Sequence, residues 1–231
     1  MARQLPTDLP PPVFRGSPRR LSSLNLTPGR CEGEIVLPKA LAPHGVMTSL
    51  PLQAHSGGGA SVSLSRTTPP GRYKAQLRLG DETVPVELDV APAPRLKVFP
   101  TTAHFTASPG GEASVDVTFA NVGNVAVELP SRFVAGIFDD DGLEIAFVEA
   151  YRNDSDDPVR LLGSFLRGLR NGYGGLLKLR VGKGVGSLEP GDERTVKLSA
   201  HLPETLKPGH SYHGIWKLGP LHYRITVAAQ K

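Results

Sequence analysis

The residues best suited to bind a metal ion form two groups in the second half of the chain. Asp139, Asp140 and Asp141 precede Gly142, and the order Asp-x-Asp-Gly is that of the start of a calcium-binding loop. A complete loop needs further oxygen ligands, but apolar side chains occupy the positions that should supply them. The sequence therefore favours a solvated hairpin turn at Asp139–Asp141 and leaves calcium binding there open.

The second group consists of four histidines near the C-terminal end, His201, His210, His213 and His222. The spacing His210-x-x-His213 could supply two zinc ligands. No cysteine lies near them, and the chain has no His-Glu-x-x-His motif. Unliganded histidines are therefore favoured, metal binding by this cluster is left open, and no metal or other cofactor is predicted.

Signals for catalysis are equally weak. The chain has no Gly-x-Ser-x-Gly motif and no glycine-rich phosphate loop followed by Lys-Ser or Lys-Thr. Cys31 follows the turn-rich segment Pro28-Gly29-Arg30, with no histidine nearby in sequence. Paired carboxylates would need a cleft as well as two acids, whereas most Asp and Glu residues here fall in turns. We predict that the chain is not an enzyme and has no catalytic or cofactor-binding residues.

Composition narrows the class of protein. The 231 residues include 22 Pro and 26 Gly, which is typical of short strands joined by many turns. The net charge is +4 and the basic residues are scattered, so nucleic-acid binding is not predicted. No apolar run is long enough to span a membrane. The absence of an apolar leader and the single cysteine predict a cytoplasmic location, with secretion without a classical signal left open.

A repeated segment sets the expected architecture. Residues 70–90 and 208–227 each read Pro-Gly, then a tyrosine, an alternating run ending in Leu-Gly, and a second alternating run ending in Val. Tyr73 precedes Gly80 by the same spacing that separates Tyr212 from Gly219. Alternation with a period of two indicates β-strands, so each segment predicts a hairpin. Two such hairpins indicate two copies of one all-β unit.

The sequence predicts an N-terminal arm and two domains joined by a linker, with one of the repeated hairpins in each domain. Residues 1–20 are rich in Pro and Arg and predict a flexible arm. Residues 21–92 predict the first β domain, and two prolines mark residues 93–95 as a short linker. Residues 96–231 predict the second, larger domain, which carries an insert at about 131–176.

The insert is expected to contain a hairpin and one helix. Strands are predicted over 133–138 and 143–151, followed by a helix that Asp156 or Asp157 caps and Asn171-Gly172 ends. Apolar residues at helical spacing form one stripe, whereas three arginines point elsewhere. The stripe consists of Val159, Leu162, Phe165, Leu166 and Leu169, and the arginines are Arg160, Arg167 and Arg170. This helix either covers its own sandwich or docks on a neighbouring protein, and both alternatives are open.

Residues 109–124 carry a resemblance to a known group of domains. They read Pro-Gly, an alternating strand and then Asn-Val-Gly-Asn, a pattern similar to that of bacterial immunoglobulin-like modules. Pro-Gly-x-Tyr at Tyr73 resembles the start of their penultimate strand, where the tyrosine hydroxyl bonds to nearby backbone. The resemblance implies the same role for Tyr212, although one extra residue precedes it, and alternation places Trp216 in the core. The expected fold class is all-β, with two tandem immunoglobulin-like β-sandwiches, the second enlarged by a hairpin and one short α-helix.

Such modules serve as spacers, adhesive units, carbohydrate-binding appendages and subunits of assemblies, so the fold leaves function open. The main hypothesis is a non-enzymatic structural or interaction subunit of a bacterial cytoplasmic complex, phage-tail-like particle or filament, with other protein subunits as partners. Its candidate interface consists of Arg160, Leu162, Phe165, Leu166, Arg167 and Arg170. The alternative is a glycan- or ligand-binding accessory module, for which Tyr151 and Tyr173 beside the insert are the better candidates.

Overall fold

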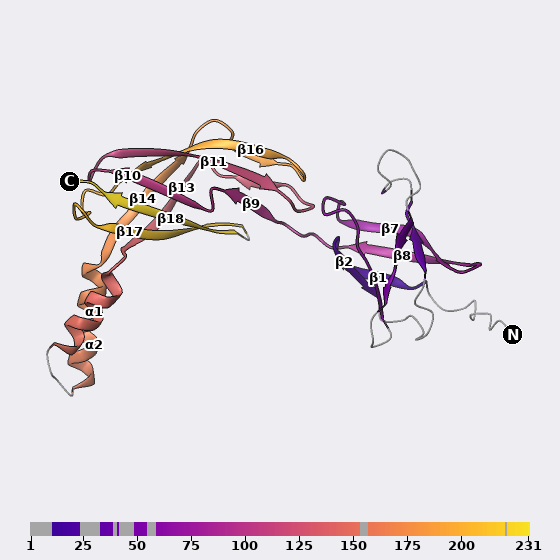
Figure 1. The fold of residues 1–231 in the computed structure, drawn as a ribbon, viewed down its shortest axis with the longest axis horizontal. Helices are drawn as coiled ribbons and strands as arrows, with labels where there is room; N and C mark the ends of the chain where they lie inside the picture. The colour runs from indigo at the N-terminus through magenta and orange to yellow at the C-terminus, as the bar shows by residue number, and fades with distance from the viewer. Residues whose placement is uncertain are drawn as a thin grey trace. The chain divides into compact units, whose positions relative to one another are not determined.

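The computed structural model describes residues 11–23, 33–38, 41, 49–54, 59–152, 157–219 and 221–231. They form two compact units, which Figure 1 shows as two groups of strands. Unit 1 comprises Met1–Pro94 with Val122–Val125, and unit 2 comprises Arg95–Asn121 with Ala126–Lys231.

Unit 1 is a β-sandwich whose strands wrap around one apolar core. Hydrogen bonds join its strands in the order β4-β3-β7-β8-β1-β2-β6-β5. Phe14, Leu21 and Leu88 are among the fully buried side chains at its centre. The strands are β1 (Val13–Ser17), β2 (Arg20–Ser23), β3 (Glu34–Val36), β4 (Ser49–Pro51), β5 (Gln53–Ala54), β6 (Ala60–Val62), β7 (Gly71–Leu79) and β8 (Glu82–Val90).

The expected flexible arm over residues 1–20 is wrong for its second half. Val13–Ser17 forms β1, which pairs in parallel with β8, and Phe14 lies opposite Leu88. The side chain of Phe14 is completely buried, so this segment belongs to the core of unit 1. Its local sequence is too short and too rich in proline to signal a strand, and its partner strand lies far along the chain. Residues 1–10 lie outside the described residues.

The repeated Leu-Gly has one explanation in both units. Gly80 follows β7 with φ of 61°, and Gly219 follows β17 (Ser211–Leu218) with φ of 55°. Residues with side chains adopt this left-handed conformation at a cost, whereas glycine adopts it freely. Each glycine therefore lets the strand that contains the tyrosine turn back into the strand that follows.

Tyr73 ties β7 to the segment that precedes it. Its hydroxyl donates a hydrogen bond to the carbonyl oxygen of Pro69 over 2.8 Å. In unit 2 the hydroxyl of Tyr212 instead accepts a hydrogen bond from the backbone N–H of Lys207 at 2.9 Å. Both tyrosines therefore fix the chain just before a long strand, although with opposite donor and acceptor roles.

We expect Tyr73→Phe to lower the free energy of unfolding by about 1 kcal/mol, because it removes one hydrogen bond without leaving a large void. Urea unfolding followed by circular dichroism measures this change. Tyr151→Phe is the control, since Tyr151 is 68% exposed and its loss of a hydroxyl should not alter stability. Equal stability of the wild type and Tyr73→Phe would show that the bond to Pro69 does not stabilise unit 1.

Unit 2 is a larger sandwich of the same kind. Its main sheet has the order β10-β18-β17-β13-β14-β16-β11-β9, and β12 pairs separately with β15. Its strands are β9 (Leu96–Phe99), β10 (Thr102–Ala107), β11 (Glu112–Asn121), β12 (Val127–Leu129), β13 (Arg132–Asp139), β14 (Tyr173–Val181), β15 (Gly186–Leu188), β16 (Glu193–His201), β17 (Ser211–Leu218) and β18 (Leu221–Ala229). The first two strands lie at opposite edges of this sheet, because β9 pairs with β11 whereas β10 pairs in parallel with β18.

An aromatic cluster fills the centre of unit 2. Trp216 stacks on Phe133 with ring centroids 3.5 Å apart and meets the edges of Phe119 and Tyr223. Burial raises the pKa of Tyr223 to about 12, and its hydroxyl donates a hydrogen bond to the carbonyl oxygen of Pro100. The expectation of two immunoglobulin-like β-sandwiches is confirmed.

The Asn-x-Gly-Asn motif holds backbone groups with both of its asparagines. In unit 2 the amide of Asn121 donates to the carbonyl oxygen of Leu188 over 2.8 Å, and Asn121 is buried. In unit 1 the side chain of Asn124 accepts from the N–H of Ala93 at 2.6 Å and donates to the carbonyl oxygen of Ala91 at 3.0 Å. The motif thus binds backbone groups at the end of β15 and in the segment just after β8.

The expected hairpin in the insert is wrong, because residues 143–151 are helical. The insert contains α1 (Gly142–Tyr151) and α2 (Pro158–Asn171) between β13 and β14. The predicted caps of the second helix are confirmed: Asp157 accepts from the N–H of Val159 at 3.0 Å, and Gly172 is the C-cap residue. Apolar residues at every second position suggested a strand over 143–151, but those side chains are exposed rather than arranged on one buried face.

Candidate protein-interaction site

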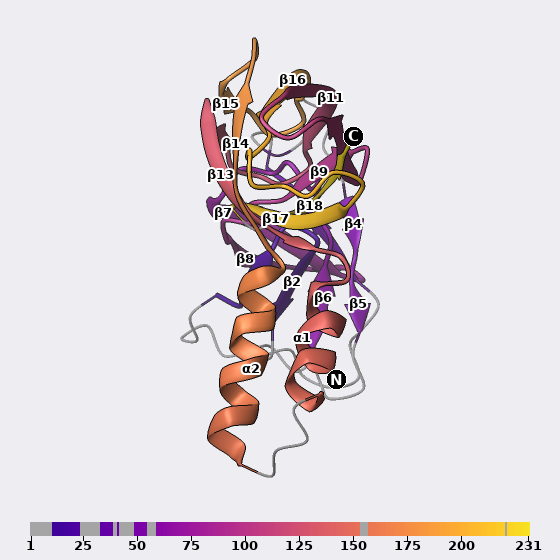
Figure 2. The same ribbon diagram turned by 90° about the vertical axis from the view of Figure 1, so that its left-hand side faces the viewer.

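The two helices form a hairpin that extends away from the strands of unit 2. Figures 1 and 2 show α1 and α2 side by side, joined to the sheet only where β13 ends and β14 begins. At this base the N–H of Asp139 donates to the carbonyl oxygen of Gly172 over 2.8 Å. The predicted helix therefore does not lie over its own sandwich.

Small residues hold the two helices together. Gly142, Ala146 and Ala150 are the buried residues of α1, and Ser164 and Gly168 are those of α2. A Cβ atom at Gly168 would lie 2.5 Å from the Cα of Ala146, and one at Gly172 would lie 2.9 Å from the Cα of Gly142. Side chains this small let two helix backbones approach closely. The contact between the helices therefore leaves no room for large apolar side chains.

Those large apolar side chains lie on the outside of the hairpin instead. Leu162 and Leu166 are each 55% exposed, and Val159 is 77% exposed. The exposed set from both helices is Leu143, Ile145, Phe147, Val148, Tyr151, Val159, Leu162 and Leu166. A helix pair in a globular protein normally buries such residues, so their exposure makes the hairpin a candidate interaction site.

Most of these side chains gather on one side, which we call the apolar hairpin face. Its centre is the pair Phe147 and Phe165, whose ring centroids are 4.9 Å apart across the two helices. Residues three or four positions apart share a side of a helix, which extends this face along both helices from the two rings. The apolar hairpin face consists of Leu143, Phe147, Tyr151, Leu162, Phe165, Leu166 and Leu169.

The charges of the hairpin are divided between its helices. Within its bounds α1 has two acidic residues, Glu144 and Glu149, and no basic residue. Within its bounds α2 has three arginines and no acidic residue. Arg160 forms an ion pair with Asp157 at 3.7 Å, and Arg167 donates to the hydroxyl of Ser164 at 2.9 Å. The helices therefore carry opposite charge.

Exposed apolar residues continue onto the strands that support the hairpin. Phe138 on β13 and Tyr173 on β14 lie with ring centroids 5.2 Å apart, and they are 46% and 43% exposed. Val134, Leu176 and Ile215 are each more than half exposed on the outer sides of β13, β14 and β17. The strands that support the hairpin therefore also carry exposed apolar side chains.

Four of the candidate metal ligands meet in two separate pairs at the base of the hairpin, whereas His201 lies at the end of β16 and His222 on β18. Nδ1 of His210 lies 2.8 Å from Asp139, and Nδ1 of His213 lies 2.7 Å from Asp140. Among the described residues, no group of three or more His, Cys, Asp or Glu side chains could hold a metal ion. The expectation of a solvated turn is wrong for Asp139, whose side chain is buried and also accepts from the N–H of Asp141. These pairs join the start of the hairpin to β17.

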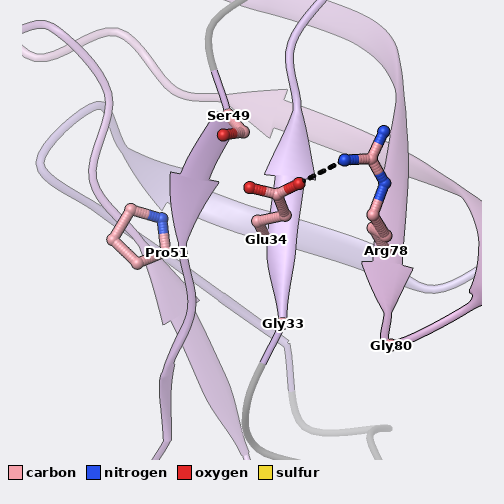
Figure 3. A pocket seen from close by; sticks show the side chains of 6 residues that line it. All are labelled: Gly33, Glu34, Ser49, Pro51, Arg78 and Gly80. Carbon is pink, nitrogen blue, oxygen red and sulfur yellow. Dashed lines mark hydrogen bonds and ion pairs between the residues drawn. The ribbon is translucent and has the colours of Figure 1, made fainter.

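A shallow hollow of about 400 Å³ lies in unit 1. It is lined by Gly33, Glu34, Ser49, Pro51, Arg78 and Gly80 (Figure 3). Glu34 and Arg78 form an ion pair with a distance of 2.6 Å, so the two charges neutralise each other. The hollow is open, and besides that pair Ser49 is the one lining residue with a polar side chain. Cys31, the one cysteine, lies outside the described residues.

No protein-family model matches the chain, and no curated protein matches it in sequence. Among solved structures, it is similar to the ASH/PapD-like domain 7 of human CEP192, with 12% identity and a TM-score of 0.31 over 59% of this chain and 85% of that one. Domains 4 and 5 of the S-layer protein SbsC share 15% identity and a TM-score of 0.30, over 74% of this chain and 69% of theirs. Titin domains Z1Z2 in complex with telethonin share 15% identity with a TM-score of 0.23, over 100% of this chain and 98% of theirs. Similarity at these values carries no argument about function.

The predicted interface residues all lie on α2, where the structure separates them into two kinds. Leu162, Phe165 and Leu166 belong to the apolar hairpin face, whereas the arginines Arg160, Arg167 and Arg170 do not. The exposed apolar residues of α1 and of the supporting strands were not among the predicted interface residues. Small residues four positions apart in both halves of the insert were the signal for a helix pair. In the described part of the chain no helix is long and apolar enough to cross a membrane.

Proposed function

We propose that this chain is a non-enzymatic structural subunit of a larger protein assembly, and that its helix hairpin is the docking element. The observation that supports this most is the exposure of eight large apolar side chains on two short helices. Burying one such side chain is worth roughly 1.5–3 kcal/mol, so a partner that covers several of them gains a substantial free energy.

The sandwich below the hairpin suits a supporting role. Its strands are joined by long antiparallel registers, for example nine residue pairs between β11 and β16. A stable sheet holds the hairpin away from its own core, so that a neighbouring molecule can reach both helices. A cytoplasmic complex, a phage-tail-like particle and a filament are the kinds of assembly that fit this role, and a chain with one cysteine needs no oxidising compartment.

Glycan binding is the weaker candidate. Tyr151 and Tyr173 are exposed, and an aromatic side chain can stack on a sugar ring. Tyr173, however, packs against Phe138, and Leu176 and Val134 on the same strands are also exposed, so the surface around it is largely apolar. The composition of the surface therefore favours a protein partner.

The double variant Leu162→Gln/Leu166→Gln tests this function. Glutamine keeps helix propensity, and both side chains are exposed, so the variant should melt within about 2 °C of the wild type. We expect it to lose the complexes that the tagged wild-type chain forms in its own cell extract, measured by native mass spectrometry.

Val185→Gln is the matched control, because Val185 is also exposed but lies just before β15, at the end of unit 2 away from the helices (Figure 2). It should retain the complexes. If the double variant instead unfolds like a core substitution, the two leucines stabilise the chain itself and the proposal is wrong.

A further inference from the structure

The charged residues of the two helices that carry the apolar hairpin face are self-complementary, acidic on α1 and basic on α2, which points to the occupant of the face. We infer that the face binds a second copy of this chain, so that two hairpins form an antiparallel four-helix bundle. This inference rests on the proposed docking function of the hairpin. In a symmetric dimer the same surface patch meets itself across a twofold axis, and a two-helix layer with one apolar face satisfies this requirement.

The division of charge selects one arrangement of the two copies. With a twofold axis parallel to the helices, each α1 lies against the partner's α2 and each α2 against the partner's α1. Every neighbouring pair in the bundle is then antiparallel and joins an acidic helix to a basic one. With the axis perpendicular to the helices, α1 would meet α1 and α2 would meet α2, which places like charges side by side. Like-charge contacts across an interface are costly, so the parallel axis is favoured.

The contacts inside the hairpin then predict one ion pair between the copies. Gly142 lies opposite Gly172, and Ala146 lies opposite Gly168. Glu144 lies midway between Gly142 and Ala146 along α1, and Arg170 lies midway between Gly168 and Gly172 along α2. The two residues are therefore at the same height along the hairpin. Helical geometry turns both side chains away from the contact between their own helices, and both are exposed. A twofold axis parallel to the helices leaves the height of both residues unchanged in the second copy. Glu144 therefore lies beside the partner's Arg170 at both edges of the apolar hairpin face.

Charge exchange tests this arrangement with the full-length chain. We expect size-exclusion chromatography with light scattering, and native mass spectrometry, to show a dimer for the wild type. Glu144→Arg and Arg170→Glu should each raise the dimer Kd about tenfold or more, because each places like charges together. Mixing these two single variants should restore dimerisation, since both contacts then join an arginine to a glutamate. The double variant should dimerise alone for the same reason, and Lys183→Glu, on an exposed loop, should behave as the wild type.

Each contrary result has a distinct meaning. A dimer whose Kd is unchanged by both single variants and by their mixing would overturn this interface. A monomeric wild type would overturn the second copy as the occupant. If that monomer still needs Leu162 and Leu166 to join complexes with a different protein, the proposed function stands; if it needs neither, both ideas fail. Binding of the monomer to vesicles of anionic lipid through the same leucines would replace the second copy by a membrane surface.

Discussion

Replacing Gly168 by alanine should separate α1 from α2 while both β-sandwiches stay folded. The new Cβ would lie 2.5 Å from the Cα and 2.9 Å from the Cβ of Ala146. These atoms belong to or adjoin the backbone, so a change of side-chain rotamer cannot relieve the overlap. Overpacking of this kind costs about 1–3 kcal/mol, and two short helices in water have little stability to lose. Faster hydrogen exchange confined to residues 142–152 and 157–172 would show the effect.

Gly163→Ala is the matched control on the same helix. No atom lies within 4 Å of a Cβ placed at Gly163, so the substitution meets no obstacle. Alanine in a helix interior is favoured over glycine by roughly 1 kcal/mol, and hydrogen exchange in α2 should therefore slow. Opposite effects of the two Gly→Ala changes would establish the close contact. Similar effects would mean that the helices do not touch at Gly168.

Phe119→Ala should lower the free energy of unfolding of unit 2 by about 3–5 kcal/mol, the largest effect expected from a single substitution here. Phe119 is completely buried and meets Trp216 edge to face with ring centroids 5.8 Å apart. The loss combines removed apolar contact with a cavity that the surrounding strands cannot close. Trp216 is the chain's one tryptophan, so its fluorescence during urea unfolding reports on unit 2 directly.

Ile215→Thr provides the comparison for this measurement. Ile215 precedes Trp216 on β17 but points outward and is 60% exposed. Threonine keeps the β-branched shape that suits a strand, so stability should change by no more than about 0.5 kcal/mol. A small effect of Phe119→Ala, equal to that of Ile215→Thr, would contradict the position of Phe119 at the centre of the core.

Local signals in the sequence were sufficient for the long strands and for α2. The hairpins after Tyr73 and Tyr212 alternate over many residues and turn at a glycine, and α2 carries an aspartate, a proline and a glycine at its ends. Each of these features stabilises its element through groups close in sequence. Periodicity and capping therefore predicted them without knowledge of the fold.

Elements that depend on distant partners could not be predicted in this way. β1 is a strand because β8 supplies its hydrogen bonds and because Phe14 fills the core of unit 1. α1 is a helix because it lies against α2, and its own alternation of apolar residues indicates a strand. In both cases tertiary contact overrides the local pattern.

Only part of the candidate site could therefore be predicted from the sequence. The stripe on α2 could be read from its spacing, but its exposure depends on what the helix contacts. α2 contacts α1 through small residues, which standard hydrophobic patterns pass over. The exposed apolar residues of the neighbouring strands could not be identified either, because the outer side of a strand is not known before the fold is known. Apolar spacing alone does not separate a helix that covers its own domain from one that presents its stripe to a partner.

The ends of the insert meet at one hydrogen bond, from the N–H of Asp139 to the carbonyl oxygen of Gly172. The helices thus enter and leave the sandwich at a single point, as a long loop between two neighbouring strands would. Because the sheet already holds the two ends of the insert together, a change in the length of the insert alters the loop-closure entropy only slightly. The hairpin is in this sense a detachable module. Evolution, or a protein engineer, could exchange it for another recognition element without altering the order of the strands that carry it.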